Sequence, residues 1–265
     1  MFKGDAPREA VPLPAATILL VRDSSDGIEV FMLERHHEIE FAAGALVFPG
    51  GKTASHDYNP ALAEVSDGAA GLSPDVCALE VAAIREAFEE AGVLIARDAE
   101  TGELVGEARL GALQPYREQI ERGEIGLLDF MRRERLRFAC DELVHFAHWI
   151  TPKSQPKRFD THFFLARVPE GQAGQHCGRE SVNSLWVRPR IAVTNPAQWK
   201  LMFPTKLNLM KLSRAETVDQ ALETARAVPP VTVEPWIEDG PGGKLLRIRE
   251  DAGYQTTRAP VRDIT

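Results

Sequence analysis

The chain has 265 residues, of which 44% are hydrophobic and 26% charged, so it can bury a substantial core and has the composition of a globular protein. Its 39 acidic residues against 31 Lys and Arg give a net charge of −8. This balance argues against nucleic acid as the main partner, because nucleic-acid-binding proteins usually carry a basic face. A phosphorylated small molecule is not excluded, since a divalent metal can supply positive charge locally.

Cysteine usage and the terminal segments indicate a reducing compartment. The three cysteines show no CxxC spacing, which argues against a disulfide framework and against a structural zinc site. The N-terminus lacks the apolar segment of a secretory signal, no run approaches 18 apolar residues, and the last three residues form no retention address. We therefore expect a soluble cytoplasmic protein with no membrane partner.

The first part of the chain predicts three strands and a long loop. Two segments rich in apolar and β-branched residues flank a turn cluster at 23–27, which predicts a hairpin. A third, short strand ends at the sharp break Pro49-Gly50-Gly51. The segment after it shows no periodicity, so we interpret it as a long surface loop inserted into the domain. The three strands and the loop cover residues 15–22, 28–35, 45–48 and 52–74.

The rest of the chain mixes helices and strands. Ser73 begins a start signal for a helix over 75–94, and Gly92 lies near its end. Because strands and helices do not alternate regularly, we expect an α+β fold with a mixed sheet sandwiched between helices. Further predicted elements are two helices within 116–137, strands at 145–151, 158–168 and 184–187, helices at 189–195 and 215–226, and a terminal hairpin of 232–237 with 244–249.

The helix over 75–94 carries a cluster of carboxylates. At about 100° per residue, Glu90 lies about 40° to one side of Glu86 and Glu89 about 60° to the other, so the three share an arc of roughly 100°. The opposite side holds apolar residues such as Ile84 and Phe88. We therefore expect one face of the helix to pack on a sheet and the other to present three negative charges.

Such a concentration of like charge favours a bound cation. Carboxylates at i,i+3 and i,i+4 repel one another, and Arg85 can pair with Glu89 at i,i+4, which leaves Glu86 and Glu90 as the unpaired charge. A hard divalent ion with oxygen ligands, Mg²⁺ or Mn²⁺, suits this cluster and keeps coordination sites open for phosphate oxygens. The alternative interpretation is a solvated acidic helix face.

The segment Arg85–Val93, with its Arg-Glu-x-x-Glu-Glu-x-Gly-apolar pattern, resembles the second half of the Nudix box, and Gly51 matches the opening glycine of that box. The first half departs from the pattern. Cys77 stands where the family has its first Glu, and 25 residues rather than five separate Gly51 from it. Glu80 is not an obvious replacement, because it lies roughly 120° from Glu86 around the helix.

The resemblance implies a Nudix fold and metal-dependent hydrolysis of a pyrophosphate linkage. It assigns catalytic roles to Arg85, Glu86, Glu89 and Glu90, and a metal site to the three glutamates together with Gly51. Two or more ions would polarise the phosphorus, activate water and stabilise the leaving oxygen.

A second resemblance concerns the substrate. Arg35, Phe41, Gly44 and the Phe-Pro-Gly-Gly turn resemble the motif of coenzyme A-directed Nudix enzymes, although His36 and Glu40 replace two of its residues. The inserted loop, the segment 149–152 and the strand 158–164 resemble the motif-nineteen branch of coenzyme A and acyl-coenzyme A diphosphatases. The similarity runs from about residue 15 to 190. It implies cleavage of coenzyme A or its esters to 3′,5′-ADP and (acyl-)4′-phosphopantetheine.

Several residues are candidates for substrate binding. Arg35 and Arg158, like Lys157, could hold phosphate groups, and Phe41 and Phe159 could stack on adenine, against the alternatives of surface charges and core aromatics. Gly50 and Gly51 complete the predicted substrate-binding set.

A further carboxylate from outside the box is expected to bind metal or to act as the base. Our candidate is Glu180, in a loop before a strand, and its competitors are Asp141 and Glu142. The seven histidines show no HExxH-like spacing, so we interpret them as structural or solvated.

The predicted organisation is a Nudix domain over 1–227, with the insertion 52–74 and a helical segment 113–137, followed by a C-terminal extension over 228–265 with a β-hairpin. The expected partner is a small-molecule diphosphate, with no nucleic acid and with a homodimer left open. Two alternatives also stay open: the same chemistry on ADP-ribose, a dinucleotide or a nucleotide sugar, and a non-catalytic module that binds a nucleotide or a protein.

Overall fold

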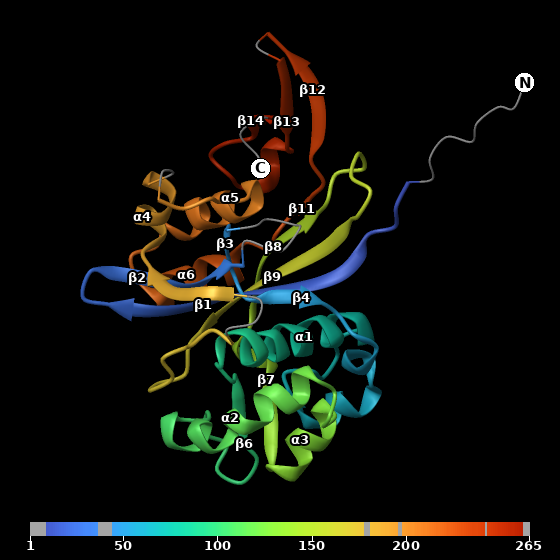
Figure 1. The fold of residues 1–265 in the computed structure, drawn as a ribbon, viewed down its shortest axis with the longest axis vertical. Coiled ribbons are helices and arrows are strands. Elements are labelled where there is room, and N and C mark those ends of the chain that lie inside the picture. Colours follow the sequence, from blue (N-terminus) through green and yellow to red (C-terminus); the bar gives the residue numbers. More distant parts are fainter. Residues whose placement is uncertain (1–8, 37–43, 178–180, 196–197, 242, 262–265) are drawn as a thin grey trace, which may run out of the picture.

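The computed structural model describes residues 9–36, 44–177, 181–195, 198–241 and 243–261. Its centre is a mixed sheet of strand order β10-β2-β1-β9-β8-β11, with β3 paired to β2 and β4 to β1 (Figure 1). The pairs β1–β9 and β8–β11 are parallel and the others antiparallel. The strands are β1 (Leu13–Ser24), β2 (Gly27–Arg35), β3 (Leu46–Val47), β4 (Gly50–Lys52), β8 (Val144–Ile150), β9 (Phe159–Arg167), β10 (Ser181–Val187) and β11 (Thr232–Val233).

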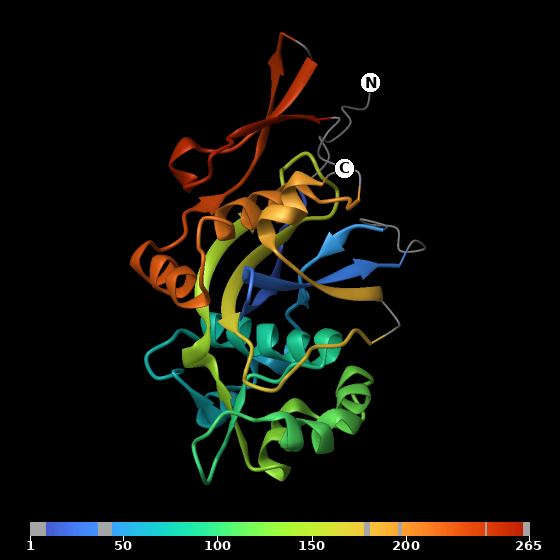
Figure 2. The same cartoon turned by 90° about the vertical axis from the view of Figure 1, so that its left-hand side faces the viewer.

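Both faces of this sheet are covered, as the apolar sequence of β1 requires. Along β1, Ile18 and Leu20 pack into the core on the side of α1, whereas the alternate residues Leu19 and Val21 pack into a second core on the side of α5 and α6. Figure 2 shows the sheet between these two helical layers. The predicted α+β sandwich is therefore confirmed. The helices are α1 (Pro74–Ala91), α2 (Glu107–Glu121), α3 (Leu127–Arg133), α4 (Pro189–Thr194), α5 (Phe203–Leu212) and α6 (Val218–Ala227).

The predicted hairpin between the first two strands is confirmed, with Ser24 paired to Gly27 at its turn. The terminal hairpin is also confirmed, as β12 (Trp236–Gly240) with β13 (Gly243–Arg247). A third strand, β14 (Arg258–Pro260), extends it to a small sheet that the sequence did not predict. This sheet stands at the end of the molecule opposite α2 and α3 (Figure 1).

Other boundaries were wrong. Residues 52–74 are not a structureless loop: they contain the 3₁₀ helices η1 (Ser55–Tyr58) and η2 (Pro60–Val65), and the strand β5 (Ser66–Asp67). A 3₁₀ helix has three residues per turn and these are only four to six residues long, so the apolar pattern of an amphipathic α-helix cannot reveal them. Helix α2 begins nine residues before the predicted position, and α5 was missed. A small sheet of order β5-β7-β6, with β6 (Ala96–Asp98) and β7 (Leu136–Ala139), and the turns η3 (Cys140–Glu142) and η4 (Glu250–Ala252) complete the fold.

The C-terminal residues are tied to the main sheet. β11 adds to the edge strand β8, and the Trp149 indole donates a hydrogen bond to the Tyr254 hydroxyl over 2.9 Å. That hydroxyl in turn donates to Asn208 Oδ1 on α5 over 2.6 Å. Among the helices of the described residues, none is both long and apolar enough to span a membrane.

Helix α1 has the predicted ends but only one of the two predicted faces. Ser73 Oγ accepts a hydrogen bond from the backbone N–H of Val76, and Gly92 ends the helix in the left-handed region at φ 64°. The apolar face packs on the sheet as expected, but the face that carries the three glutamates is largely buried, because α1 lies between the central sheet and the layer of α2 and α3. Arg85 and Glu86, on the predicted charged face, are only 6% and 8% exposed.

Burial of α1 also affects Glu80. Its Oε2 is buried and has no hydrogen-bond partner among the described residues. Burial raises the pKa of Glu80 from 4.5 to about 7, an increase that Asp141 reinforces and a hydrogen bond with Cys140 partly offsets. The ionised form of Glu80 is therefore less stable in the folded protein than in the unfolded chain.

We predict that Glu80→Gln stabilises the protein in a pH-dependent way. The pKa of Glu80 is higher in the folded state than in the unfolded chain. Below pH 4.5 the carboxyl is protonated in both states, so it does not lower the stability of the fold. As the pH rises from 4.5 through 7, the unfolded chain ionises more readily and the free energy of unfolding falls. The variant should match the wild type near pH 4.5 and gain about 1–3 kcal/mol in free energy of unfolding above pH 7, measured by urea denaturation. The exposed Glu223→Gln is the control, and an equal gain at both pH values would contradict the assignment.

Candidate active site

A cavity of about 660 Å³ opens where the second half of α1 meets β4, β1 and β9. Its size is in the range of small-molecule sites. Residues from β2, β3, β10, α2, the start of α5 and several connecting segments also line it. Among its described lining residues are four carboxylates (Glu86, Glu89, Glu90 and Glu121), three cations (Arg35, Lys52 and Lys157) and three aromatic rings (Phe48, Phe159 and Phe163).

The Gly-Gly turn brings β4 against α1. The backbone N–H of Gly50 donates a hydrogen bond to Glu90 Oε2 over 2.8 Å. A Cβ atom on Gly51 would lie 2.5 Å from Glu86 Oε1, and one on Gly50 would lie 2.6 Å from the Ala16 carbonyl oxygen. Gly50 therefore requires glycine, because the backbone of β1 lies against it, whereas a side chain at position 51 would push the Glu86 carboxylate aside.

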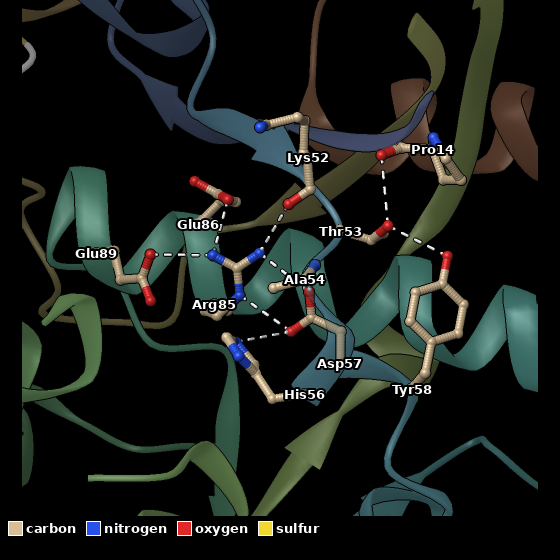
Figure 3. A network of polar contacts seen from close by, with 10 residues as sticks. All are labelled: Pro14, Lys52, Thr53, Ala54, His56, Asp57, Tyr58, Arg85, Glu86 and Glu89. Atoms are coloured by element: carbon tan, nitrogen blue, oxygen red, sulfur yellow. Dashed lines mark hydrogen bonds and ion pairs between the residues drawn. The ribbon is translucent and has the colours of Figure 1, made fainter. Parts of the chain in front are cut away.

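The buried Arg85 guanidinium organises the acidic side chains around it (Figure 3). Its Nη1 donates to Glu86 Oε1 over 2.8 Å and to Glu89 Oε2 over 3.0 Å. Its Nε and Nη2 donate to the two carboxylate oxygens of Asp57, and Nη2 also donates to the Lys52 carbonyl. The predicted pair with Glu89 is confirmed. The expectation that Glu86 would stay unpaired was wrong, because the guanidinium reaches both carboxylates.

Asp57 was missed by sequence reasoning. It lies 28 residues before Arg85, on η1, in the segment interpreted as a loop. Its Oδ2 accepts a hydrogen bond from the Ala54 backbone N–H over 2.7 Å, so the same carboxylate fixes η1 and Arg85. No local pattern signals this contact.

Burial and crowding shift the pKa of Glu89. Burial raises the pKa of Glu89 to about 7, and the nearby Glu86 adds to this increase, while Arg85 opposes it. One guanidinium is thus shared by several carboxylates, and further positive charge would stabilise them.

The predicted substrate residues do not all lie at the cavity. Arg35 lines it at the end of β2, and its buried Nε has no hydrogen-bond partner in the described part of the chain. Lys157 and Phe159 also line it, with Lys157 Nζ 5.5 Å from the centre of the Phe159 ring. Phe41 and Glu180 lie outside the described residues.

Arg158, predicted to bind a phosphate of the substrate, forms ion pairs within the protein instead. The side chain is 4% exposed, and it is absent from the described residues that line the cavity. Its guanidinium donates to the Thr151 and Ala10 carbonyls and forms ion pairs with Glu9 at 2.7 Å and Glu234 at 2.6 Å. Arg158 therefore joins Glu9 and Glu234 to the residue before β9, and four of its five N–H donors are already used within the protein.

The competing bases Asp141 and Glu142 also lie elsewhere. Both form ion pairs with Arg97 and are absent from the described lining of the cavity. Glu121, at the end of α2, does line it and was missed because no motif in the sequence connects this helix with the box.

Comparison with known families agrees with this geometry. Residues 63–205, more than half of the chain, match the family model of the NUDT19 Nudix domain. The chain belongs to this Nudix family. The resemblance of the Arg85–Val93 segment to the Nudix box is thereby confirmed, and α1 is the Nudix helix.

Individual relatives are distant. The chain is 26% identical over 225 residues to a provisionally named nudix hydrolase 7 of Caenorhabditis elegans, covering 83% of this chain and 67% of the relative. It is 23% identical over 222 residues to the acyl-coenzyme A diphosphatase NUDT19 of Xenopus laevis, covering 69% of this chain and 58% of the relative. The chain thus spans about two thirds or less of these relatives.

One solved structure is matched over almost its whole length. The crystal structure of a NUDIX hydrolase from Alicyclobacillus acidocaldarius superposes with a TM-score of 0.72 and 27% sequence identity, covering 83% of this chain and 99% of that one. Together with the family model, this similarity supports a Nudix hydrolase, a pyrophosphohydrolase enzyme.

Nudix hydrolases generally use divalent metal ions, and the donor set of this cavity fits such an ion. Glu86, Glu89 and Glu90 offer only oxygen ligands, and these suit hard divalent cations. Glu86 and Glu89 are turned to Arg85, and Glu90 to the Gly50 N–H. In these positions the three glutamates do not place one carboxylate oxygen each within 4.8 Å of the other two. Among the described residues, only a separate cluster that contains two histidines brings three potential ligand atoms this close.

We predict that Gly51→Ala impairs the enzyme without unfolding it. The new methyl group would displace the Glu86 carboxylate, and a misplacement of about 1 Å in a catalytic group can cost roughly 100-fold in rate. Diphosphate hydrolysis should fall by up to about this factor, while circular dichroism stays that of the wild type. Gly111→Ala on α2, where nothing lies within 4 Å of the added Cβ, is the control. Full activity in Gly51→Ala would show that the close approach is not required.

Proposed function

We propose that the chain hydrolyses the pyrophosphate of coenzyme A or an acyl-coenzyme A, giving 3′,5′-ADP and (acyl-)4′-phosphopantetheine. The observation that carries this proposal is the meeting of three cations with the carboxylates of α1 in one cavity. Coenzyme A has three phosphate groups, two in the pyrophosphate and one on the 3′-hydroxyl, whereas ADP-ribose has two.

Arg35 is the cation best suited to a phosphate. Its Nε is buried yet unpartnered among the described residues, and a buried donor without an acceptor is unfavourable until a ligand supplies one. A guanidinium can bind phosphate oxygens through two parallel hydrogen bonds, which an ammonium cannot. We assign Lys157 and Lys52 to the remaining phosphate charge and Phe159 to stacking on the adenine.

The carboxylates of α1 would hold Mg²⁺ or Mn²⁺. We assign Glu86 and Glu90 as the principal ligands, with Glu89 and Gly51 in support. The bound ion would supply a Lewis acid at the phosphorus and lower the pKa of the attacking water. Arg85 does not reach the substrate in this scheme: it positions Glu86 and Glu89, and Asp57 holds it in place. Glu180 stays our candidate for the carboxylate outside the box.

The relatives support the substrate class. The Xenopus relative is named an acyl-coenzyme A diphosphatase. The Phe-Pro-Gly-Gly turn, which resembles the motif of coenzyme A-directed enzymes, leads into β4 and lines the cavity through Phe48, Gly50 and Gly51.

We predict that Glu90→Gln lowers kcat by roughly 100-fold or more with the fold intact, because a metal-bound charge contributes several kcal/mol to the transition state. The glutamine oxygen can still accept the hydrogen bond from Gly50, so thermal unfolding should change little. The matched control is Glu223→Gln, an exposed position on α6. A wild-type kcat in Glu90→Gln would show that another carboxylate holds the ion.

A substrate panel tests the assignment of coenzyme A. The wild type and Arg35→Gln would be assayed with Mg²⁺ or Mn²⁺ on coenzyme A, acyl-coenzyme A, 3′-dephospho-coenzyme A, ADP-ribose and NADH, and the products identified by chromatography. We expect coenzyme A and its ester to give 3′,5′-ADP. Arg35→Gln should raise the KM for them about tenfold or more, since a hydrogen bond to a charged group contributes about 1.5–3 kcal/mol. Turnover of ADP-ribose with none of coenzyme A would overturn the substrate, and no turnover at all would overturn the enzymatic function.

A further inference from the structure

Strand β9 presents different chemistry on its two faces. Phe159, Thr161 and Phe163 line the cavity. Side chains alternate along a strand, so Asp160 and His162 point to the opposite face of the sheet. On that face the cross-strand partner of His162 is His148 of β8.

A bulge in β8 adds a third histidine. The register of β8 against β9 shifts between His145 and Ala147, so that His145 and His148 share a face although they are three positions apart, an odd number that would place them on opposite faces of a regular strand. The ring centre of His162 lies 4.0 Å from that of His148 and 5.0 Å from that of His145. Sequence analysis interpreted these histidines as structural or solvated, because only the strand pairing brings them together.

Three of these side chains converge on one point. His148 Nε2 lies 2.5 Å and His162 Nε2 3.8 Å from Asp160 Oδ1, and the ligand atoms of all three residues lie within 4.8 Å of one another. The side chains of His148, His162 and Asp160 are 16%, 22% and 36% exposed, so an ion from solvent can reach them.

We propose that His148, Asp160 and His162 form a Zn²⁺ site on the face of β9 opposite Phe159 and Thr161, outside the described lining of the hydrolytic cavity. Two imidazoles and one carboxylate are the donor set of zinc sites with three protein ligands and an open fourth position. Mg²⁺ and Ca²⁺ prefer oxygen ligands alone, so this site and the carboxylates of α1 would select different metals.

The second ring nitrogen of His148 and of His162 has a hydrogen-bond partner that can orient the ring toward a metal ion. His148 Nδ1 lies 2.8 Å from Thr232 Oγ1, and His162 Nδ1 lies 3.1 Å from His145 Nε2. When each Nδ1 donates its proton to that partner, the Nε2 lone pair of each ring is left for the ion. Metal-binding histidines are commonly oriented by such a hydrogen bond from the second nitrogen.

The site would also join parts of the chain. Its ligands belong to β8 and β9, and Thr232 belongs to β11, the first strand of the C-terminal extension. An ion bound to the folded state alone stabilises that state. Zn²⁺ should therefore raise the Tm of the protein by fixing the edge of the sheet at which β11 pairs.

The test has two parts, both on the full chain in excess Mg²⁺. Zn²⁺ binding is measured by titration calorimetry, and a second titration with Co²⁺ records the visible absorption spectrum of the bound Co²⁺. We expect one equivalent to bind, with the Co²⁺ spectrum of a tetrahedral nitrogen and oxygen site. Asp160→Asn and His162→Gln should lower the Zn²⁺ affinity by at least about 100-fold, and Thr232→Val by about tenfold. The control His176→Gln, whose ring bonds Ser184 instead, should bind like the wild type.

Two outcomes would overturn the proposal. One is wild-type Zn²⁺ affinity in both Asp160→Asn and His162→Gln. The other is loss of the site in Glu86→Gln/Glu90→Gln with these histidines intact, which would place the ion on α1. Because the Co²⁺ spectrum is read on the wild type, it reports the ligands even if a variant fails to fold, and a spectrum of oxygen ligands alone would equally contradict the site.

Discussion

The site depends on the burial of one guanidinium. Arg85 is 6% exposed and bonds to three carboxylates, of Asp57, Glu86 and Glu89, and to the Lys52 carbonyl. Removing one partner of a buried ion pair costs about 3–5 kcal/mol, because the other charge is left uncompensated. Arg85 thus fixes both the acidic side chains and the segment that follows β4. The inserted segment is held to the Nudix helix by the same contact that orders the carboxylates.

This arrangement explains why the box tolerates its unusual first half. Cys77 occupies the first acidic position, but it packs partly buried against the core near Glu80 and is absent from the described lining of the cavity. The insertion, in turn, supplies Asp57 as a carboxylate bound to Arg85. Asp57, from the inserted segment, thus takes part in ordering the helix, while Cys77 at the first position of the box packs against the hydrophobic core.

The sequence predicted what local patterns determine. The strands of the hairpin, the ends of α1 and the arc of Glu86, Glu89 and Glu90 follow from periodicity, turn residues and caps. Contacts between distant segments were not predictable, because no local rule pairs Arg85 with Asp57 or Arg158 with Glu9 and Glu234. Helix α5 was missed for a related reason: it is buried on several sides, so it lacks the single apolar stripe that marks an amphipathic helix.

The two faces of β9 show how one strand can serve separate tasks. Because side chains alternate, a register fixed by pairing with β1 and β8 sets both faces at once. Phe159 and Thr161 can face the cavity only if Asp160 and His162 face away from it. The burial of Arg158 at the start of this strand, through its bonds to Thr151 and the chain ends, holds that register. An arginine outside the described lining of the cavity thereby helps to set which side chains of β9 line it.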